Sequence, residues 1–254
     1  MRYLGVLRTA EENNGHPVRT HAVSRALPAV TTTEHAATSE RLSRSLTGFG
    51  PTGIATLLAI LLIGPAWFRA LLVRAWAKWS GTPYREIGFI RPKGWLTTVL
   101  TGVVFGSVLK ILMTAVVMPL IGAPSVNQTY HYLVDNKAAL PGMLFTLTVT
   151  AGFGEETVFR GYLFERCRKI FGHGPGVTIA TVPITSMIFA LAHYLDQGSP
   201  GVEQALFTGL FLATLFVLAG NLWLPMVTHA AFDLTALAMI YWNLESEIAH
   251  LFFQ

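Results

Sequence analysis

Long apolar runs dominate the chain after residue 50, and short polar or Gly/Pro-rich segments separate them. A membrane-crossing helix needs roughly 20 apolar residues to cover about 30 Å of hydrocarbon. The windows that meet or approach this length are 52–68, 95–121, 140–171, 177–195, 202–219 and 222–242. The pattern predicts an all-α fold: a polytopic transmembrane helix bundle with about six hydrophobic segments.

Composition supports the same class. Hydrophobic residues make up 52% of the chain and charged residues only 13%, against about 25% charged residues in soluble domains. We therefore expect a multi-pass integral membrane protein, placed in a bacterial-type plasma membrane. The single cysteine, Cys167, excludes an internal disulfide and a cysteine-only metal cluster within one chain.

The basic residues concentrate in three places, namely the N-terminal tail, residues 69–93 and residues 160–169. Because they flank apolar windows, they favour contact with anionic membrane lipids and argue against nucleic-acid binding. The bias of lysine and arginine predicts that the loops at 69–93 and 160–169 are cytoplasmic. The oligomeric state leaves no signal in the sequence.

Composition also predicts four regions. Residues 1–50, rich in Thr, Ser, Ala and Arg, are expected to form a disordered or loosely structured basic tail. Residues 51–138 are assigned to N-terminal membrane helices with a cytoplasmic basic loop, and residues 139–243 to a helical core that carries the candidate catalytic groups. Residues 244–254 are expected to form a C-terminal tail.

Ionisable side chains inside the apolar windows are the candidates for function, because each costs about 2.5 to 3.5 kcal/mol to insert and needs a protein or water environment. They imply a polar intramembrane site. The set is Lys110, Glu155, Glu156, Arg160, His193, His229 and Asp233. For Lys110, packing between helices or snorkelling explains the residue as well as a functional role does.

Helical spacing separates the two adjacent glutamates. Glu156 and Arg160 are four residues apart, so they share a helix face and can pair. Glu155 is rotated by about 100° and is left free. A free carboxylate in a poorly solvated pocket suits a general base that takes a proton from water. The alternative is a structural ion network that joins two helices.

Two further windows bring imidazoles at one-turn spacing. Phe189 and His193 lie four residues apart, as do His229 and Asp233. A hydrogen-bonded histidine at a helix end and a buried His–Asp hydrogen bond explain these pairs equally well. Together, the three windows supply a carboxylate, one imidazole, and a second imidazole beside a carboxylate. This set suits a site in which water attacks a carbonyl group. Such a site needs a base, an oxyanion-stabilising group and a dry cavity.

These motifs resemble those of the CPBP family, which contains CAAX proteases and bacteriocin-processing enzymes. Glu155-Glu156 with Arg160 is similar to its EExxxR motif, Phe189 with His193 to FxxxH, and His229 with Asp233 to HxxxN/D. The resemblance covers about residues 140–242. It implies an intramembrane endopeptidase that cuts peptides or lipidated, CAAX-type protein substrates.

By motif position, the resemblance implies that Glu155 is the general base and that His193 holds or shares the water. His229 and Asp233 would stabilise the oxyanion, Arg160 would orient Glu156, and Phe189 would line the substrate pocket. An ionised Asp233 only accepts hydrogen bonds, so it must be protonated, orient His229, or bind a metal.

Whether a metal takes part is left open. Glu155, His193, His229 and Asp233 are acceptable ligands for zinc or another divalent cation, and the family is commonly labelled metalloprotease. The same residues also describe a metal-free glutamate protease. The sequence contains no HExxH motif.

Two alternatives to a protease remain. One is a non-catalytic transporter or a bacteriocin-immunity-type binding protein, which Lys110 and the other intramembrane ionisable groups would suit. The internal repeat that many transporters show is not detected. The other alternative is an enzyme-shaped scaffold that binds peptides without cutting them.

Overall fold

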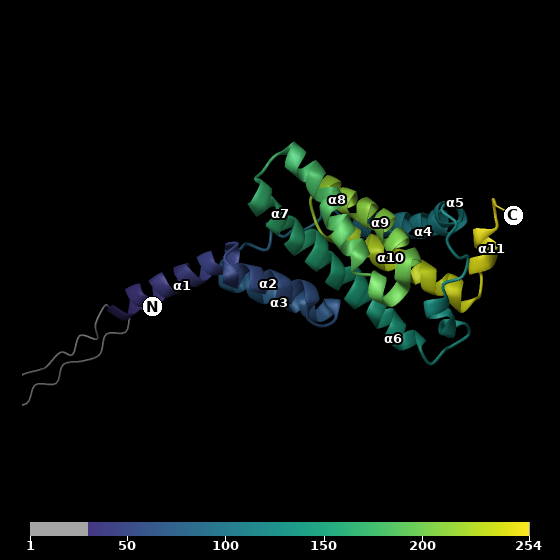
Figure 1. The fold of residues 1–254 in the computed structure, drawn as a ribbon, viewed down its shortest axis with the longest axis horizontal. Helices are drawn as coiled ribbons and strands as arrows, with labels where there is room; N and C mark the ends of the chain where they lie inside the picture. The colour runs from purple at the N-terminus through teal and green to yellow at the C-terminus, as the bar shows by residue number, and fades with distance from the viewer. Residues whose placement is uncertain (1–29, 254) are drawn as a thin grey trace, which may run out of the picture. The chain divides into compact units, whose positions relative to one another are not determined.

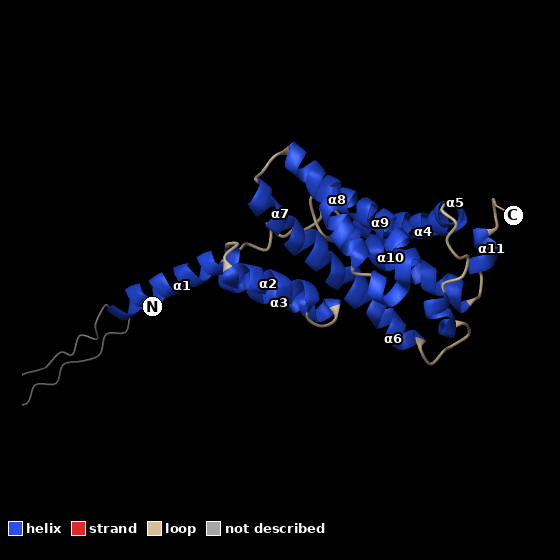
Figure 2. Cartoon of the chain, viewed as in Figure 1, coloured by secondary structure: helices blue, strands red, loops and turns tan. Residues whose placement is uncertain are grey.

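The computed structural model describes residues 30–253, and every regular element in that range is a helix (Figure 2). The chain divides into two units, Met1–Thr38 and Ser39–Gln254. Of the first unit, the structure describes only residues 30–38, which begin the first helix. The elements are α1 (Val30–Thr47), α2 (Pro51–Leu62), α3 (Ala66–Ser80), α4 (Trp95–Leu112), η1 (Met113–Val117), α5 (Met118–Leu120), η2 (Gln128–Leu133), α6 (Leu140–Phe145), η3 (Thr146–Glu155), η4 (Thr157–Leu163), α7 (Phe164–Phe171), α8 (Pro175–Leu191), α9 (Tyr194–Ala219), α10 (Trp223–Tyr241) and α11 (Glu245–Ala249).

The helical class is confirmed, but the number of membrane segments is not. Within residues 30–253, three stretches are long and apolar enough to cross a membrane: Trp95–Leu120, Tyr194–Ala219 and Trp223–Tyr241. A fourth is added if the bent pair Ala36–Thr47 and Pro51–Leu62 counts as one span. Helix α8 is apolar, but its 17 residues, Pro175–Leu191, are fewer than a membrane span needs.

The prediction of one apolar helix over residues 52–68 is wrong. Helix α2 ends at Leu62, Gly64 adopts a positive φ of 75°, and α3 begins at Ala66 after Pro65. Glycine tolerates this backbone conformation and proline suits the entry to the next helix, so the Gly-Pro pair ends one helix and starts another. Arg69 secures the turn because its Nη1 donates to the Leu61 carbonyl at 2.9 Å.

The segment predicted to be a disordered or loosely structured tail, residues 1–50, contains a helix in its described part. Residues 1–29 lie outside the described residues, whereas Val30–Thr47 form α1. The end of this helix is tied down, because the Trp76 indole and the Arg166 guanidinium donate to the carbonyls of Leu46 and Thr47 at 3.1 and 2.9 Å. Distant side chains thus complete a helix end that composition alone does not reveal.

Helix α10 occupies the centre of the bundle and packs against α4, η3 and α9 (Figure 1). Gly102 and Gly106 allow its close approach to α4. A Cβ atom on Gly106 would lie 2.2 Å from the Thr228 carbonyl oxygen, and one on Gly102 would lie 2.7 Å from the Val227 side chain. Small residues spaced four apart permit such backbone contact between membrane helices. Residues on this face of α4 therefore meet α10 directly.

The opposite face of α4 is apolar and exposed. Leu96, Leu100, Val104 and Val108 repeat every four residues and are exposed. Their spacing matches that of the glycines but is offset by two positions, which places them on the far side of the helix. This division of one helix into a packing face and an exposed apolar face is the pattern expected of a helix in contact with lipid.

The segment 140–171 is helical throughout, running through α6, η3, η4 and α7. The sequence pattern predicts one long helix or two abutting ones, and the structure shows one continuous helical run. Its middle, Thr146–Glu155 and Thr157–Leu163, is wound as π-helix. Such i→i+5 winding is rare and often occurs at functional sites. Glu155 ends the first π-helical stretch, and Glu156 separates it from the second.

Candidate active site

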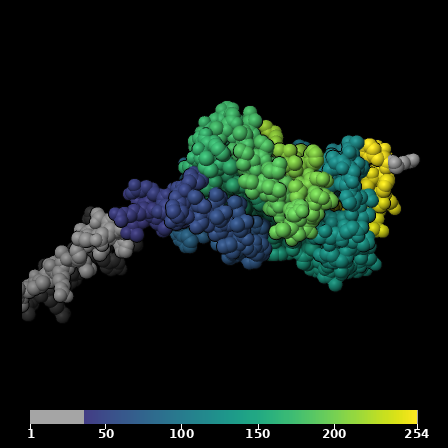
Figure 3. Space-filling view, viewed as in Figure 1, coloured from purple at the N-terminus to yellow at the C-terminus, as the bar shows by residue number. Residues whose placement is uncertain are grey.

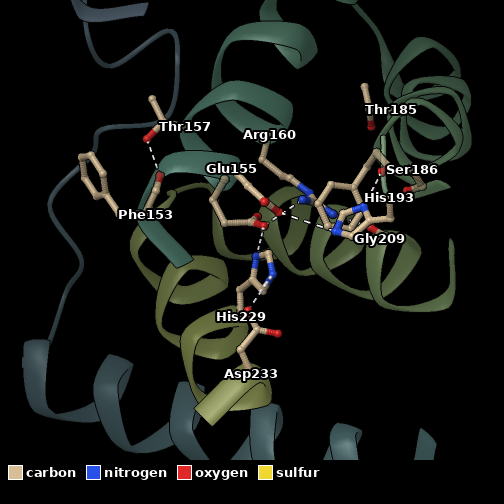
Figure 4. Close-up of polar contacts among 12 residues, drawn as sticks. Phe153, Glu155, Thr157, Arg160, Thr185, Ser186, His193, Gly209, His229 and Asp233 are labelled. Carbon is tan, nitrogen blue, oxygen red and sulfur yellow. Dashed lines mark hydrogen bonds and ion pairs between the residues drawn. The ribbon is translucent and has the colours of Figure 1, made fainter. Parts of the chain in front are cut away.

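Three helical segments bring the candidate residues together (Figure 4). Glu155 ends η3, Glu156 follows it, and Arg160 belongs to η4. Phe189 lies near the end of α8 with His193 just beyond, in the break before α9. His229 and Asp233 lie on α10. In the close-up, Arg160, His193 and His229 point inward from different segments toward Glu155.

Glu156 is the buried hub of the arrangement. Its Oε1 accepts hydrogen bonds from Arg160 Nη1 at 2.7 Å and from His229 Nδ1 at 2.8 Å. All three side chains are almost fully buried. The pairing of Glu156 with Arg160, predicted from spacing, is confirmed. The bond to His229, 73 residues away, is an addition that spacing does not predict.

Arg160 extends this hub to a third helix. Its Nη2 donates to the carbonyl oxygen of Gly209 on α9 at 3.2 Å. Its guanidinium carbon also lies 4.3 Å from the centre of the Phe189 ring, within cation–π range. A buried charge is tolerable only when it is paired and hydrogen-bonded. The Glu156–Arg160 pair therefore holds η4, α9 and α10 together, as the structural alternative predicts for these two residues.

Glu155 has different surroundings. Its Oε2 lies 4.0 Å from His193 Nε2, and the two side chains are 18% and 20% exposed. This oxygen is buried and has no hydrogen-bond partner among the described residues. The separation exceeds a direct hydrogen bond and suits a small polar molecule held between the two groups. Of the two adjacent glutamates, Glu155 is thus the one whose carboxylate can contact a bound molecule.

The hydrogen bond made by Nδ1 of His193 determines which tautomer the ring adopts. Nδ1 lies 2.8 Å from the Phe189 carbonyl oxygen, which only accepts, so Nδ1 carries the proton. In a neutral ring, Nε2 then presents a lone pair toward Glu155. The Phe189 ring packs edge-on against the His193 ring at 4.6 Å and against His229 at 5.9 Å. Phe189 therefore positions both imidazoles.

His229 and Asp233 share a proton by the same reasoning. His229 Nδ1 must donate to the Glu156 carboxylate, and Nε2 lies 3.5 Å from Asp233 Oδ2. An unprotonated Nε2 facing an ionised carboxylate would bring two lone pairs together. One proton therefore resides on the His229 Nε2 or Asp233 side of this pair. Of the three roles open to Asp233, the geometry supports orientation of His229 or a protonated carboxyl.

A cavity of about 170 Å³ adjoins these groups. Its lining includes Glu155, Phe189, His193, His229 and Asp233, but neither Glu156 nor Arg160. The candidate residues therefore fall into two sets: the lining set, which can touch a bound molecule, and the Glu156–Arg160 pair behind it. Phe189 also lines the cavity.

The residues do not converge on a metal position. Within residues 30–253, no group of three or more His, Cys, Asp and Glu side chains is arranged to hold a metal ion. The Nδ1 atoms of His193 and His229 bind Phe189 and Glu156, which leaves only the Nε2 atoms as ring nitrogens that could ligate a metal. A zinc site needs about four ligands at about 2.0 to 2.3 Å, and the described side chains as arranged do not form such a set for the zinc or other divalent cation that the sequence left open.

Residues 137–235 match the model of one family, described as type II CAAX prenyl endopeptidase, Rce1-like. The chain carries an Rce1-like domain. The family resemblance read from the sequence is thereby confirmed. Comparisons with curated proteins and with solved structures give no match. The family is a family of membrane-embedded proteases, and together with the long apolar helices the match makes this chain an integral membrane protein.

The Rce1-like domain contains every residue described above as part of the site, from Glu155 to Asp233. The cavity extends beyond it. Lys110 on α4, Tyr130 on η2 and Glu245 on α11 also contribute to the lining. Of these, only Lys110 stands out in the sequence, because it interrupts an apolar window. Tyr130 and Glu245 lie in polar segments, where nothing distinguishes them from solvated loop residues.

Tyr130 retains its hydroxyl proton under ordinary conditions. Burial and the nearby carboxylates, Asp233 first among them, raise the pKa of Tyr130 above its usual value. Burial likewise raises the pKa of Glu245, opposed by the backbone N–H of Asn127. The cavity wall outside the Rce1-like domain therefore offers a hydroxyl donor, a cation and a carboxylate.

Proposed function

We propose that the protein is an intramembrane endopeptidase that hydrolyses peptide bonds in membrane-associated or lipidated, CAAX-type substrates. The observation that carries this is the cavity in which Glu155 Oε2 and His193 Nε2 face each other across 4.0 Å. The match to CAAX prenyl endopeptidases over residues 137–235 supports the reaction class.

In the proposed reaction, a water molecule lies between Glu155 and His193 and donates a hydrogen bond to each. Glu155 takes one proton as the water oxygen attacks the carbonyl carbon, and a negative charge develops on the carbonyl oxygen. Glu155 then gives the proton to the leaving amide nitrogen as the C–N bond breaks. Such positioned proton transfer contributes about 10²- to 10⁴-fold.

The proton shared by His229 and Asp233 supplies the hydrogen bond that stabilises the oxyanion in this scheme. Both residues line the same cavity as Glu155. A donor held in place before the reaction, in a site shielded from water, stabilises developing charge more than a donor in bulk water does. The Glu156–Arg160 pair keeps His229 oriented through the 2.8 Å bond to its Nδ1.

No step of this scheme passes through a metal, because the side chains are not arranged as a ligand set. A bound zinc or other divalent cation would polarise the carbonyl or activate water. Metal content is therefore part of the test.

The test is to purify wild type, Glu155→Ala and His193→Ala in detergent, and to profile cleavage of a library of prenylated and unmodified peptides by mass spectrometry. We expect the wild type to cut and both variants to lose cleavage. Exposed residues provide matched controls: Glu247→Ala and His173→Ala should cut at the wild-type rate. Wild-type turnover in both Glu155→Ala and His193→Ala would refute the assignment.

The transporter alternative makes the opposite prediction. Flux through liposomes that persists in Glu155→Gln, with no cleavage by the wild type, would favour it. Peptide binding without cleavage by any variant would favour a non-catalytic scaffold.

A further inference from the structure

Tyr130 lines the site cavity but takes no part in the reaction proposed above. It lies on η2 and shares the wall of the 170 Å³ cavity with Glu155 and Asp233. Its hydroxyl has no hydrogen-bond partner among residues 30–253. The hydroxyl of Tyr241 at the end of α10, by contrast, donates to Asp135 at 3.3 Å. An unpartnered hydroxyl at the wall of a cavity can donate to a molecule bound there.

The packing of the aromatic ring places this hydroxyl near Asp233. The ring lies against a buried apolar cluster of η2 and α10 that includes Leu237. Leu237 follows Asp233 by four residues, so the two share one face of α10. Asp233 also contributes more than Glu155 to the raised pKa of Tyr130. Because the effect of a charge weakens with distance, the hydroxyl lies on the Asp233 side of the cavity.

Hydrogen bonds at both ends hold η2 in place. Before it, the Asn127 N–H points between the two oxygens of the Glu245 carboxylate, at 3.4 Å from each. Beyond it, the Asp135 N–H donates to the Tyr241 carbonyl oxygen at 3.1 Å. In Figure 3, the yellow C-terminal residues lie against teal residues, the colour of η2 and of the segment before it. A donor on a segment fixed in this way needs little rearrangement when charge develops beside it.

The side of the cavity that holds Tyr130 is where the proposed reaction generates negative charge. In that reaction, the proton shared by His229 and Asp233 supplies one hydrogen bond to the carbonyl oxygen of the substrate. The oxygen of a tetrahedral intermediate carries three lone pairs, so it can accept a second. The hydroxyl of Tyr130 keeps its proton, because burial and nearby carboxylates raise its pKa. It therefore remains a donor throughout the reaction.

We infer that the Tyr130 hydroxyl donates a second hydrogen bond to the substrate carbonyl oxygen as that oxygen becomes an oxyanion. The proton stays on the tyrosine, and no covalent bond to the side chain forms or breaks. The inference rests on the proposed function, because it adds a donor to the oxyanion site of that reaction. Tyr130 is then a catalytic residue that precedes the Rce1-like domain, which begins at residue 137.

The first test removes the hydroxyl alone. Tyr130→Phe should lower kcat on a cleavable peptide by about 10²-fold, the effect of losing one oxyanion donor, with KM nearly unchanged. Because the hydroxyl has no partner in the protein, thermal unfolding should match that of the wild type. Tyr132→Phe is the matched control on the same helix, since Tyr132 is 58% exposed, and it should cut at the wild-type rate. A wild-type kcat in Tyr130→Phe would overturn the inference.

A second test separates direct donation from an effect through Asp233. Single-turnover rates are compared for Asp233→Ala and for Asp233→Ala combined with Tyr130→Phe. A direct donor should lower the rate again, by roughly tenfold or more, because its own hydrogen bond to the oxyanion is lost. If the second substitution has no further effect, the tyrosine acts only by orienting Asp233, and direct donation is refuted.

Binding of a transition-state mimic tests Tyr130 independently of turnover. The probe is a fluorescent peptidyl phosphinate, whose tetrahedral phosphorus carries a charged oxygen where the oxyanion forms. Fluorescence anisotropy should show that Tyr130→Phe weakens phosphinate binding by roughly tenfold or more, whereas Tyr132→Phe does not. Binding of the parent peptide, measured in the Glu155→Gln background, should be the same with and without the hydroxyl.

The two measurements distinguish failure of this inference from failure of the reaction. If the wild type cuts no peptide, the proposed function fails, and phosphinate binding that depends on Tyr130 still supports the donor. If the wild type cuts peptides but Tyr130→Phe binds the phosphinate as tightly as the wild type does, the proposed function stands and the inference falls. A phosphinate that the wild type does not bind would also count against the donor.

Discussion

Glu155 and Glu156 are adjacent in sequence but face different environments. Glu156 is fully buried and bonded to Arg160 and His229, whereas Glu155 is 18% exposed and lies 4.0 Å from His193 at the cavity. Successive residues of a helix point in different directions. One carboxylate therefore helps to hold η4, α9 and α10 together, and the other remains open to a bound molecule.

Substituting the two glutamates should give distinct phenotypes. Glu155→Gln should lower kcat by about 10²- to 10⁴-fold with little change in thermal unfolding, because a cavity-facing base is lost. Glu156→Gln should destabilise the fold by about 3 to 5 kcal/mol, because the buried Arg160 loses its charge partner. Turnover and thermal unfolding in detergent, measured on the same samples, test the division. Equal losses of activity with equal stability would contradict it.

Asp233 offers a test of the shared proton. Asp233→Ala leaves His229 Nε2 without its neighbour at 3.5 Å, and we expect kcat to fall by about 10²-fold, as when one oxyanion donor is removed. Asp233→Asn should retain much more activity, since its amide can donate a hydrogen bond directly. Single-turnover rates on one peptide give the comparison. A loss in Asp233→Asn as large as in Asp233→Ala would mean that the carboxylate itself is needed.

Treatment with metal chelators tests whether cleavage requires a bound metal. Because the described side chains do not form a three-ligand set, we expect cleavage to persist after dialysis against 1,10-phenanthroline and EDTA. Elemental analysis of the active protein should find well under one transition metal per chain. Loss of activity on chelation that added zinc restores, with one zinc per chain, would contradict the metal-free scheme.

The approach of α4 to α10 depends on Gly106. A Cβ at this position would lie 2.2 Å from the Thr228 carbonyl oxygen, so Gly106→Ala should force the helices apart and cost about 1 to 3 kcal/mol. Gly142→Ala is the matched control, because a Cβ there meets nothing within 4 Å. Thermal unfolding of both variants measures the difference. A neutral Gly106→Ala would show that α4 is not held this closely.

The sequence by itself determined much of the local chemistry. Apolar windows indicated a helical membrane protein, and the four-residue spacing of Glu156 and Arg160 predicted a pair that the structure contains. The motifs between Glu155 and Asp233 identified the family that residues 137–235 match. These inferences succeeded because they depend on helix periodicity and on the cost of placing a charge in lipid. Both effects are determined by neighbouring residues within one segment of the chain.

Window length predicted six membrane segments, whereas the described residues provide three or four. Hydropathy does not register the break at Gly64 and Pro65, nor the helix end that Trp76 and Arg166 complete. In both cases the deciding interaction is a backbone conformation or a contact between distant residues.

Only the tertiary structure decided which groups meet. Spacing left Glu155 free but named no partner for it, and it linked neither Glu156 to His229 nor Lys110 to Gln204. Those contacts join helices that are 73 and 94 residues apart in the chain. They depend on how closely the backbones approach, and here glycines at Gly102 and Gly106 allow it, because a side chain at either position would collide with α10.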